Sequence, residues 1–176
     1  TAPPAYQAQL KKANDEYLAS ITARPDQWAS HYNLGNYLLG RGELQSAVAS
    51  YQTAMKLDPQ AIMPMVNTSI AYARMGKNDQ AEKDLQKALN LAPDNAAANF
   101  NMGLLKAGQN EQAAETYLKK AFAADPQMAQ AAYNLCVITA KDRIGEAVTW
   151  CRKASELRPQ DPKYAYTLAF YLNRQG

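Results

Sequence analysis

Prolines recur along this chain at a nearly constant spacing. They stand at positions 25, 59, 93, 126 and 159, so successive prolines are 34, 34, 33 and 33 residues apart, and each begins a short polar loop. Because proline ends helices and favours turns, these positions mark the boundaries of a repeated unit. A repeat of this length predicts an array of similar structural units stacked on one another.

Within each unit, small and large residues recur at fixed distances from the proline. An alanine stands 12 residues before it, a large or apolar residue eight before it and a small residue five before it, as in Ala47, Tyr51 and Ala54. Separations of four and three residues place them on one face of a helix. The first half of each unit carries a mid-sized residue followed by a small one, such as Leu34-Gly35. We therefore expect two helices of about 12 to 14 residues per unit, with small residues where they cross.

This pattern resembles that of the tetratricopeptide repeat family over almost the whole chain. In one unit the matching residues are Leu34, Gly35, Leu38, Ala47, Tyr51, Ala54 and Pro59. The resemblance implies an all-α fold, a right-handed α-solenoid of antiparallel helix hairpins with about ten helices. The third and fourth units are one residue shorter between the small residue and the alanine, so we expect tighter turns there.

The repeat boundaries predict a single array with incomplete units at both ends. Four full repeats cover residues 28–61, 62–95, 96–128 and 129–161. Residues 1–27 match only a second helix, from Ala5 to Thr22, and residues 162–176 match only a first helix. Since natural arrays usually close with a polar capping helix, we expect a fragment of a longer protein or an array whose caps are missing. The two half repeats also predict head-to-tail association between copies.

Composition argues against several classes of function. The 19 basic and 16 acidic residues are interspersed, which disfavours nucleic acid as a partner. No apolar run approaches the ~18 to 20 residues of a membrane span. A single histidine, His31, and two cysteines cannot supply a zinc site, and His31 falls on the expected helix-packing face rather than in a catalytic site. We therefore expect no metal, no cofactor and no enzymatic activity.

The resemblance places the first helix of each unit along a concave groove. Directly before each pair of the Leu-Gly type, a ladder of amides recurs: Asn33, Asn67, Asn101 and Asn134. An asparagine amide can both donate to and accept from a peptide backbone, and the ladder resembles the one in the superhelical region of O-linked N-acetylglucosamine transferases. The alternative is that these asparagines only brace adjacent helices.

Two further stripes are expected to face the same groove. One comprises Tyr32, Val66, Phe100, Tyr133 and Tyr166, and the other comprises Asn36, Ile70, Leu104, Val137 and Phe170. Together they would form an amphipathic channel for an extended segment or a helix, although the aliphatic members could instead pack between neighbouring first helices. Chaperone-binding members of the family clamp a carboxylate with Lys and Arg in these stripes. The matching positions here carry no cation, which disfavours that clamp.

These features predict a non-catalytic scaffold that binds a peptide or protein segment in the groove. The alternative is an accessory region of a larger enzyme or redox protein, similar to a glycosyltransferase or a secreted multihaem cytochrome, whose catalytic part is absent from this chain.

The two cysteines fall in the same expected hairpin. Cys136 occupies the small-residue position of one helix and Cys151 the large-residue position of its partner, 15 residues later. A disulfide requires Cα atoms about 4.4 to 6.8 Å apart, which close helix packing permits, and two buried thiols are the alternative. A disulfide would indicate the periplasm or the cell exterior, whereas free thiols would indicate the cytoplasm.

Overall fold

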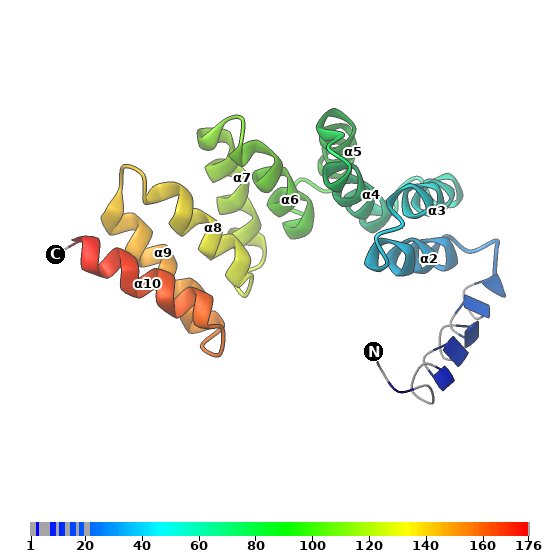
Figure 1. The fold of residues 1–176 in the computed structure, drawn as a ribbon. Helices are drawn as coiled ribbons and strands as arrows, with labels where there is room; N and C mark the ends of the chain where they lie inside the picture. Colours follow the sequence, from blue (N-terminus) through cyan, green and yellow to red (C-terminus); the bar gives the residue numbers. More distant parts are fainter. Residues whose placement is uncertain are drawn as a thin grey trace. The chain divides into compact units, whose positions relative to one another are not determined.

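The protein, described here from a computed structural model, is built from α-helices. The structure describes residue 3, residues 8–9, 11–12, 15–16 and 18–19, and residues 22–175. Within this part of the chain there are nine helices of more than ten residues (Figure 1): α2 (Trp28–Gly40), α3 (Leu44–Leu57), α4 (Ile62–Arg74), α5 (Asn78–Leu91), α6 (Ala96–Ala107), α7 (Glu111–Ala124), α8 (Ala129–Thr139), α9 (Ile144–Leu157) and α10 (Pro162–Gln175). The predicted all-α fold of helix hairpins is confirmed. The further helix expected from Ala5 to Thr22 lies largely outside the described residues.

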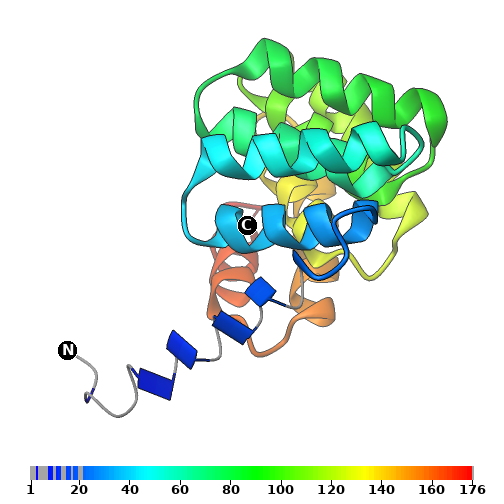
Figure 2. The ribbon, with the colours of Figure 1, turned by 90° about the vertical axis from the view of Figure 1, so that its right-hand side faces the viewer.

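Contacts divide the chain into two compact units, Thr1–Asp84 and Leu85–Gly176, with the boundary inside α5. In the N-terminal unit, α2 packs on α3 and α3 packs on α4. Figure 2 shows α2 and α3 running side by side. In the C-terminal unit, α6 packs on α7, α7 on α8, α8 on α9 and α9 on α10. Within each unit, helices therefore pack on their hairpin partners and hairpins pack on one another, as α3 does on α4 and α7 on α8.

The proline loops end one hairpin and begin the next through local hydrogen bonds. Asp58 and Asp125, which precede Pro59 and Pro126, each accept a hydrogen bond from the backbone N–H of the glutamine after the proline. Two equivalent side chains of the first helices also reach back to a loop proline. His31 Nε2 lies 2.9 Å from the carbonyl oxygen of Pro25, and Asn99 Nδ2 donates to that of Pro93 at 2.8 Å.

The turns inside the hairpins differ between the longer and the shorter repeats. In the two 34-residue repeats the turn contains a left-handed glycine, Gly42 with φ 77° and Gly76 with φ 73°. These are the only positive φ angles among the described residues. In the two 33-residue repeats the first helices α6 and α8 are shorter, with 12 and 11 residues against 13 in α2 and α4. The missing residue therefore shortens the first helix and removes the left-handed turn.

The two helices of a hairpin cross where a small residue faces a large one. A Cβ atom added to Gly35 would lie 2.3 Å from the ring of Tyr51, and one added to Gly103 would lie 2.7 Å from Cγ of Leu118. Tyr51 and Leu118 are completely buried, as are Ala47, Ala54 and Ala114. The close approach of the two helices thus depends on the small residue, because a larger side chain there would overlap with the large residue of the facing helix.

In the α8–α9 hairpin a disulfide occupies the position of the small and large pair. Cys136 and Cys151 are bonded, their Cα atoms are 5.1 Å apart, and both are buried. They form a cluster with Ala140 and Ala147. Disulfides of this kind persist in oxidising compartments such as the bacterial periplasm.

We predict that Gly35→Ala destabilises the fold by about 1 to 3 kcal/mol, because the new methyl group overlaps with the buried ring of Tyr51. Gly40→Ala, in the same helix, is the matched control, since a Cβ there meets nothing within 4 Å. The control is expected to leave stability unchanged or to raise it slightly. Urea unfolding followed by circular dichroism measures both, and equal midpoints for the two variants would contradict the small-to-large crossing.

Candidate functional site

Large apolar side chains are exposed on the first helices of the C-terminal unit. Leu104 on α6, Val137 on α8 and Phe170 on α10 are 41%, 38% and 46% exposed, and they are spaced by one 33-residue repeat. Tyr166, one turn before Phe170, is 74% exposed. We call these four side chains the first-helix face. All four belong to the stripes expected from the sequence.

Aromatic contacts fix α10 against α8 beside this face. The rings of Tyr133 on α8 and Tyr164 on α10 are 5.2 Å apart, and Tyr164 is buried. The Lys163 ammonium lies 3.9 Å from the centre of the Tyr133 ring. Farther along α10, the Arg174 guanidinium lies 5.9 Å from the centre of the Phe170 ring. Half-buried Tyr133 thus serves helix packing and also borders the exposed face.

The amide ladder of the C-terminal unit is held by its own helices. Asn101 Nδ2 donates to the carbonyl oxygen of Ala97 and Asn134 Nδ2 to that of Gln130, each at 2.8 Å. Thr167, at the equivalent position of α10, donates to the carbonyl oxygen of Lys163 in the same way. Each bond spans one helical turn and fixes the side chain. Among the described residues, the amide oxygens of Asn101 and Asn134 accept no hydrogen bond, which leaves two acceptors in fixed positions.

In the N-terminal unit the corresponding side chains bond to one another. Asn67 Nδ2 on α4 donates to Asn36 Oδ1 on α2 at 2.7 Å and lies 3.5 Å from the Tyr32 hydroxyl. The buried Tyr51 hydroxyl donates to the same Asn36 oxygen at 2.9 Å, and burial raises the pKa of Tyr51 to about 12. This network braces α2, α3 and α4. At Asn67 the structure therefore shows the bracing role that sequence reasoning left open.

The remaining predicted positions differ in exposure. Asn33 is exposed, whereas Ile70 and Phe100 are half-buried. Val66 is only 1% exposed and belongs to the core, so its side chain is not accessible to a ligand. The structure thus leaves apolar side chains accessible at repeat spacing in the C-terminal unit and forms a hydrogen-bonded cluster in the N-terminal unit.

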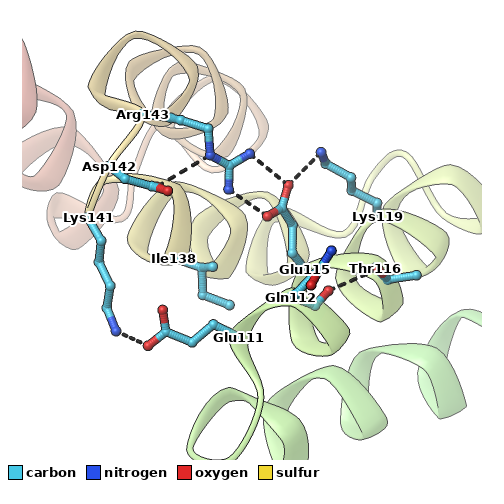
Figure 3. Close-up of a pocket in the computed structure, with 9 residues that line it drawn as sticks. All are labelled: Glu111, Gln112, Glu115, Thr116, Lys119, Ile138, Lys141, Asp142 and Arg143. Carbon is cyan, nitrogen blue, oxygen red and sulfur yellow. Dashed lines mark hydrogen bonds and ion pairs between the residues drawn. The ribbon is translucent and has the colours of Figure 1, made fainter.

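A charged cavity of about 640 Å³ lies between α7 and the α8–α9 turn (Figure 3). Glu115 accepts two hydrogen bonds from the Arg143 guanidinium and pairs with Lys119. Lys141 pairs with Glu111, and Glu146 pairs with both Lys119 and Arg143. Every charged side chain that lines the cavity has a partner of opposite charge. The sequence analysis did not find this network, although Glu115 and Lys119 stand at the i,i+4 spacing of helical ion pairs.

The network alters the titration of its central carboxylate. The hydrogen bonds from Arg143, with a smaller contribution from Lys119, lower the pKa of Glu115 to about 2. Because this pKa is lower than that of an unfolded glutamate, the pairing stabilises the fold at neutral pH and is lost as the pH falls toward 2. The ion pairs that line the cavity therefore join the α6–α7 and α8–α9 hairpins, and they leave no charged side chain of the lining without a partner.

Within the described residues, no three His, Cys, Asp or Glu side chains gather in a way that could hold a metal ion. No helix in the same part of the chain is both long and apolar enough to cross a bilayer.

Three family models match the chain. A model described as TPR repeat matches residues 71–108, and two described as tetratricopeptide repeat match residues 28–61 and 101–162.

Two curated relatives match part of the chain. DnaJ homolog subfamily C member 3 of Homo sapiens is 32% identical over 87 residues, which is 48% of this chain and 17% of the relative. The UDP-N-acetylglucosamine--peptide N-acetylglucosaminyltransferase of Giardia intestinalis is 31% identical over 77 residues, which is 44% of this chain and 5% of the relative. The chain therefore spans a small fraction of the length of these proteins.

Two solved structures illustrate the similarity of fold. The Thermus thermophilus TPR protein TTC0263 superposes with a TM-score of 0.74 at 24% identity, over 94% of each chain. YrrB, described as a TPR protein with an unusual peptide-binding site, superposes with a TM-score of 0.68 at 19% identity, over 90% of this chain and 83% of its own.

We predict that Asn67→Ala and Asn101→Ala differ in their effect on stability, because Asn67 bonds to a neighbouring helix and Asn101 only to its own. Asn67→Ala removes the donor that joins α4 to α2 and is expected to cost about 1 to 2 kcal/mol of stability. Asn101→Ala removes only a bond within α6 and adds a better helix former, so stability should stay within about 0.5 kcal/mol of the wild type. Thermal unfolding measures both, and an equal loss in the two variants would refute the distinction.

Proposed function

Because the chain belongs to the tetratricopeptide repeat family, we propose that it is a non-catalytic interaction scaffold that binds a segment of another protein. The observation that carries the proposal is the row formed by Leu104, Val137 and Phe170, which repeats with the period of the fold. Exposed apolar patches are typical of surfaces that a partner covers. The first-helix face is therefore the proposed binding surface.

The polar groups beside the face suit a peptide backbone. The amide oxygens of Asn101 and Asn134 are held in place by the bonds their nitrogens make within the helix. Fixed acceptors at repeat spacing can receive N–H groups of an extended segment, while the apolar row accommodates its side chains. The peptide-binding site for which YrrB is described supports a peptide ligand for this fold.

We extend the proposal to the N-terminal unit with a smaller set of contacts. Exposed Asn33 and half-buried Tyr32 and Ile70 are its counterparts there. Asn36 and Asn67 bond to each other, so their contribution is to hold the helices in place.

A second candidate is that the chain is an accessory region of a larger enzyme. The match to the Giardia intestinalis glycosyltransferase, which covers 5% of that protein, favours it. The two candidate functions do not exclude each other, because an accessory repeat array of an enzyme would also act by binding a protein segment.

A peptide selection tests the proposed surface. A library of random dodecapeptides is selected against the wild type, and the dissociation constants of enriched peptides are then measured by fluorescence polarisation. The triple variant Leu104→Ser, Val137→Ser, Phe170→Ser should bind roughly tenfold or more weakly. The control is Leu57→Ser, Leu91→Ser, since these leucines are 44% and 50% exposed at the ends of second helices. Equal losses in both variants, or no enrichment on the wild type, would overturn the proposal.

We also propose that copies of the chain associate through α10. Ala165, Ala169 and Leu172 are exposed on α10, whereas Ala132, Cys136 and Thr139 at the equivalent positions of α8 are completely buried. In α8 these positions are covered by the second helix of its own hairpin, so the same face of α10 lacks that cover within the described residues.

Sedimentation velocity over a wide range of protein concentration tests this association. The wild type is expected to shift to larger species as concentration rises, and Leu172→Glu is expected to remain monomeric because a charge would be buried at the contact. Leu57→Glu, which changes a leucine of similar exposure, should behave as the wild type. A wild type that stays monomeric at every concentration would exclude the contact.

A further inference from the structure

The first helices of the repeats carry no acidic residue. Neither Asp nor Glu occurs in α2, α4, α6, α8 or α10. These helices hold more than a third of the chain, so an even spread of the 16 acidic residues would place about five or six in them. The acidic residues instead lie on second helices, in loops and near the N-terminus. The fold does not require acidic residues to be absent from the first helices. Positions beside the first-helix face are exposed or half-buried and tolerate charge.

In the C-terminal unit some cations pair with carboxylates and others stand over aromatic rings, as Lys120 and Lys153 do on the second helices α7 and α9. Lys119, Lys141 and Arg143, on the second-helix and turn side, are all paired with carboxylates. Lys163 and Arg174, on α10, are exposed and contact the rings of Tyr133 and Phe170. Within the described part of the chain, neither side chain meets a carboxylate. Asp161, two residues before Lys163, accepts a hydrogen bond from the backbone N–H of that lysine.

These two cations lie directly beside the apolar row. Arg174 stands over Phe170, which is part of the first-helix face, and Lys163 stands over Tyr133, four residues before Val137. A cation held over an aromatic ring keeps hydrogen-bond donors directed to solvent. A surface with apolar side chains, unpaired cations and no carboxylate is complementary to a ligand with apolar side chains and negative charge.

We propose that the segment bound by the first-helix face is acidic and amphipathic, with Asp or Glu side chains interleaved among aliphatic or aromatic ones. The proposal rests on the proposed function, since it specifies the ligand of the same surface. Carboxylates of the ligand pair with Lys163 and Arg174, and its apolar side chains cover Leu104, Val137 and Phe170. The absence of acidic residues from the first helices removes repulsion along the whole bound segment.

The peptides enriched by selection on the wild type provide the first test. We expect their sequences to contain more Asp and Glu than the unselected library. For each of the tightest peptides, a version with Gln for Glu and Asn for Asp should bind about two- to fivefold more weakly for each charge that contacts a cation. The difference should diminish as salt is added, since exposed charges are screened.

Variants of the protein provide the second test. Lys163→Gln, Arg174→Gln should weaken binding of the acidic peptides roughly four- to 25-fold while leaving their neutral versions unchanged. The matched control is Arg152→Gln, Lys153→Gln, which makes the same change of net charge on exposed positions of the second helix α9. The control should stay within about twofold of the wild type. Circular dichroism confirms that both variants fold.

The outcomes separate this inference from the proposed function. If the apolar triple variant loses binding but neutral and acidic peptides bind equally, the ligand class is wrong and the binding surface stands. If no peptide depends on the apolar row, both fail. The same face could attract an anionic membrane, so cosedimentation with vesicles of phosphatidylcholine and phosphatidylserine is measured in parallel. Vesicle binding that is lost in Lys163→Gln, Arg174→Gln, with no enrichment of acidic peptides, would overturn the proposal in favour of a lipid surface.

Discussion

The close crossing of two helices within each hairpin is the constraint on which the other features depend. Gly35 allows the ring of Tyr51 to lie against the backbone of α2, and Gly103 does the same for Leu118 on α6. The large residue is then completely buried, and neighbouring hairpins extend this core, as where Tyr164 of α10 joins Ala132 and Ala154. The crossing does not involve the outer side of the first helix, where Leu104 on α6 and Val137 on α8 are exposed.

Much of the fold could be predicted from the sequence, because its signals are local and repeat. The repeat pattern consists of the prolines, the alanines and the small residue of each first helix. These residues determine the turns and contacts of one hairpin, which is contiguous in the chain. The candidate site was harder to predict. Asn67 and Asn101 occupy equivalent positions, yet one bonds to Asn36 on a neighbouring helix and the other to its own helix. That difference depends on which residue the adjacent repeat presents, and the repeat pattern does not contain this information.

The distribution of charge connects the stability of the array with its proposed surface. Carboxylates on α7 and α9 bind Lys119 and Arg143 and so join two hairpins. Their place on second helices and turns leaves the first helices free of negative charge. The distribution of acidic residues therefore has two effects. It joins neighbouring hairpins on the side of the second helices, and it favours an acidic ligand on the side of the first helices. The sequence contained this signal in the positions of its acidic residues, and it became interpretable once the helices and their partners were known.

The disulfide of the α8–α9 hairpin has a mechanical consequence. In a repeat array each hairpin contacts only its neighbours, so a pulling force unravels the hairpins in separate steps. The bond between Cys136 and Cys151 joins residues 15 positions apart, and this stretch cannot lengthen while the bond is intact. A fully extended stretch of that length would span about 50 Å, so the oxidised hairpin would lengthen by about 45 Å less than a reduced one. A chain that carries load between its two ends would therefore extend by a distance set by the oxidation state of a single hairpin.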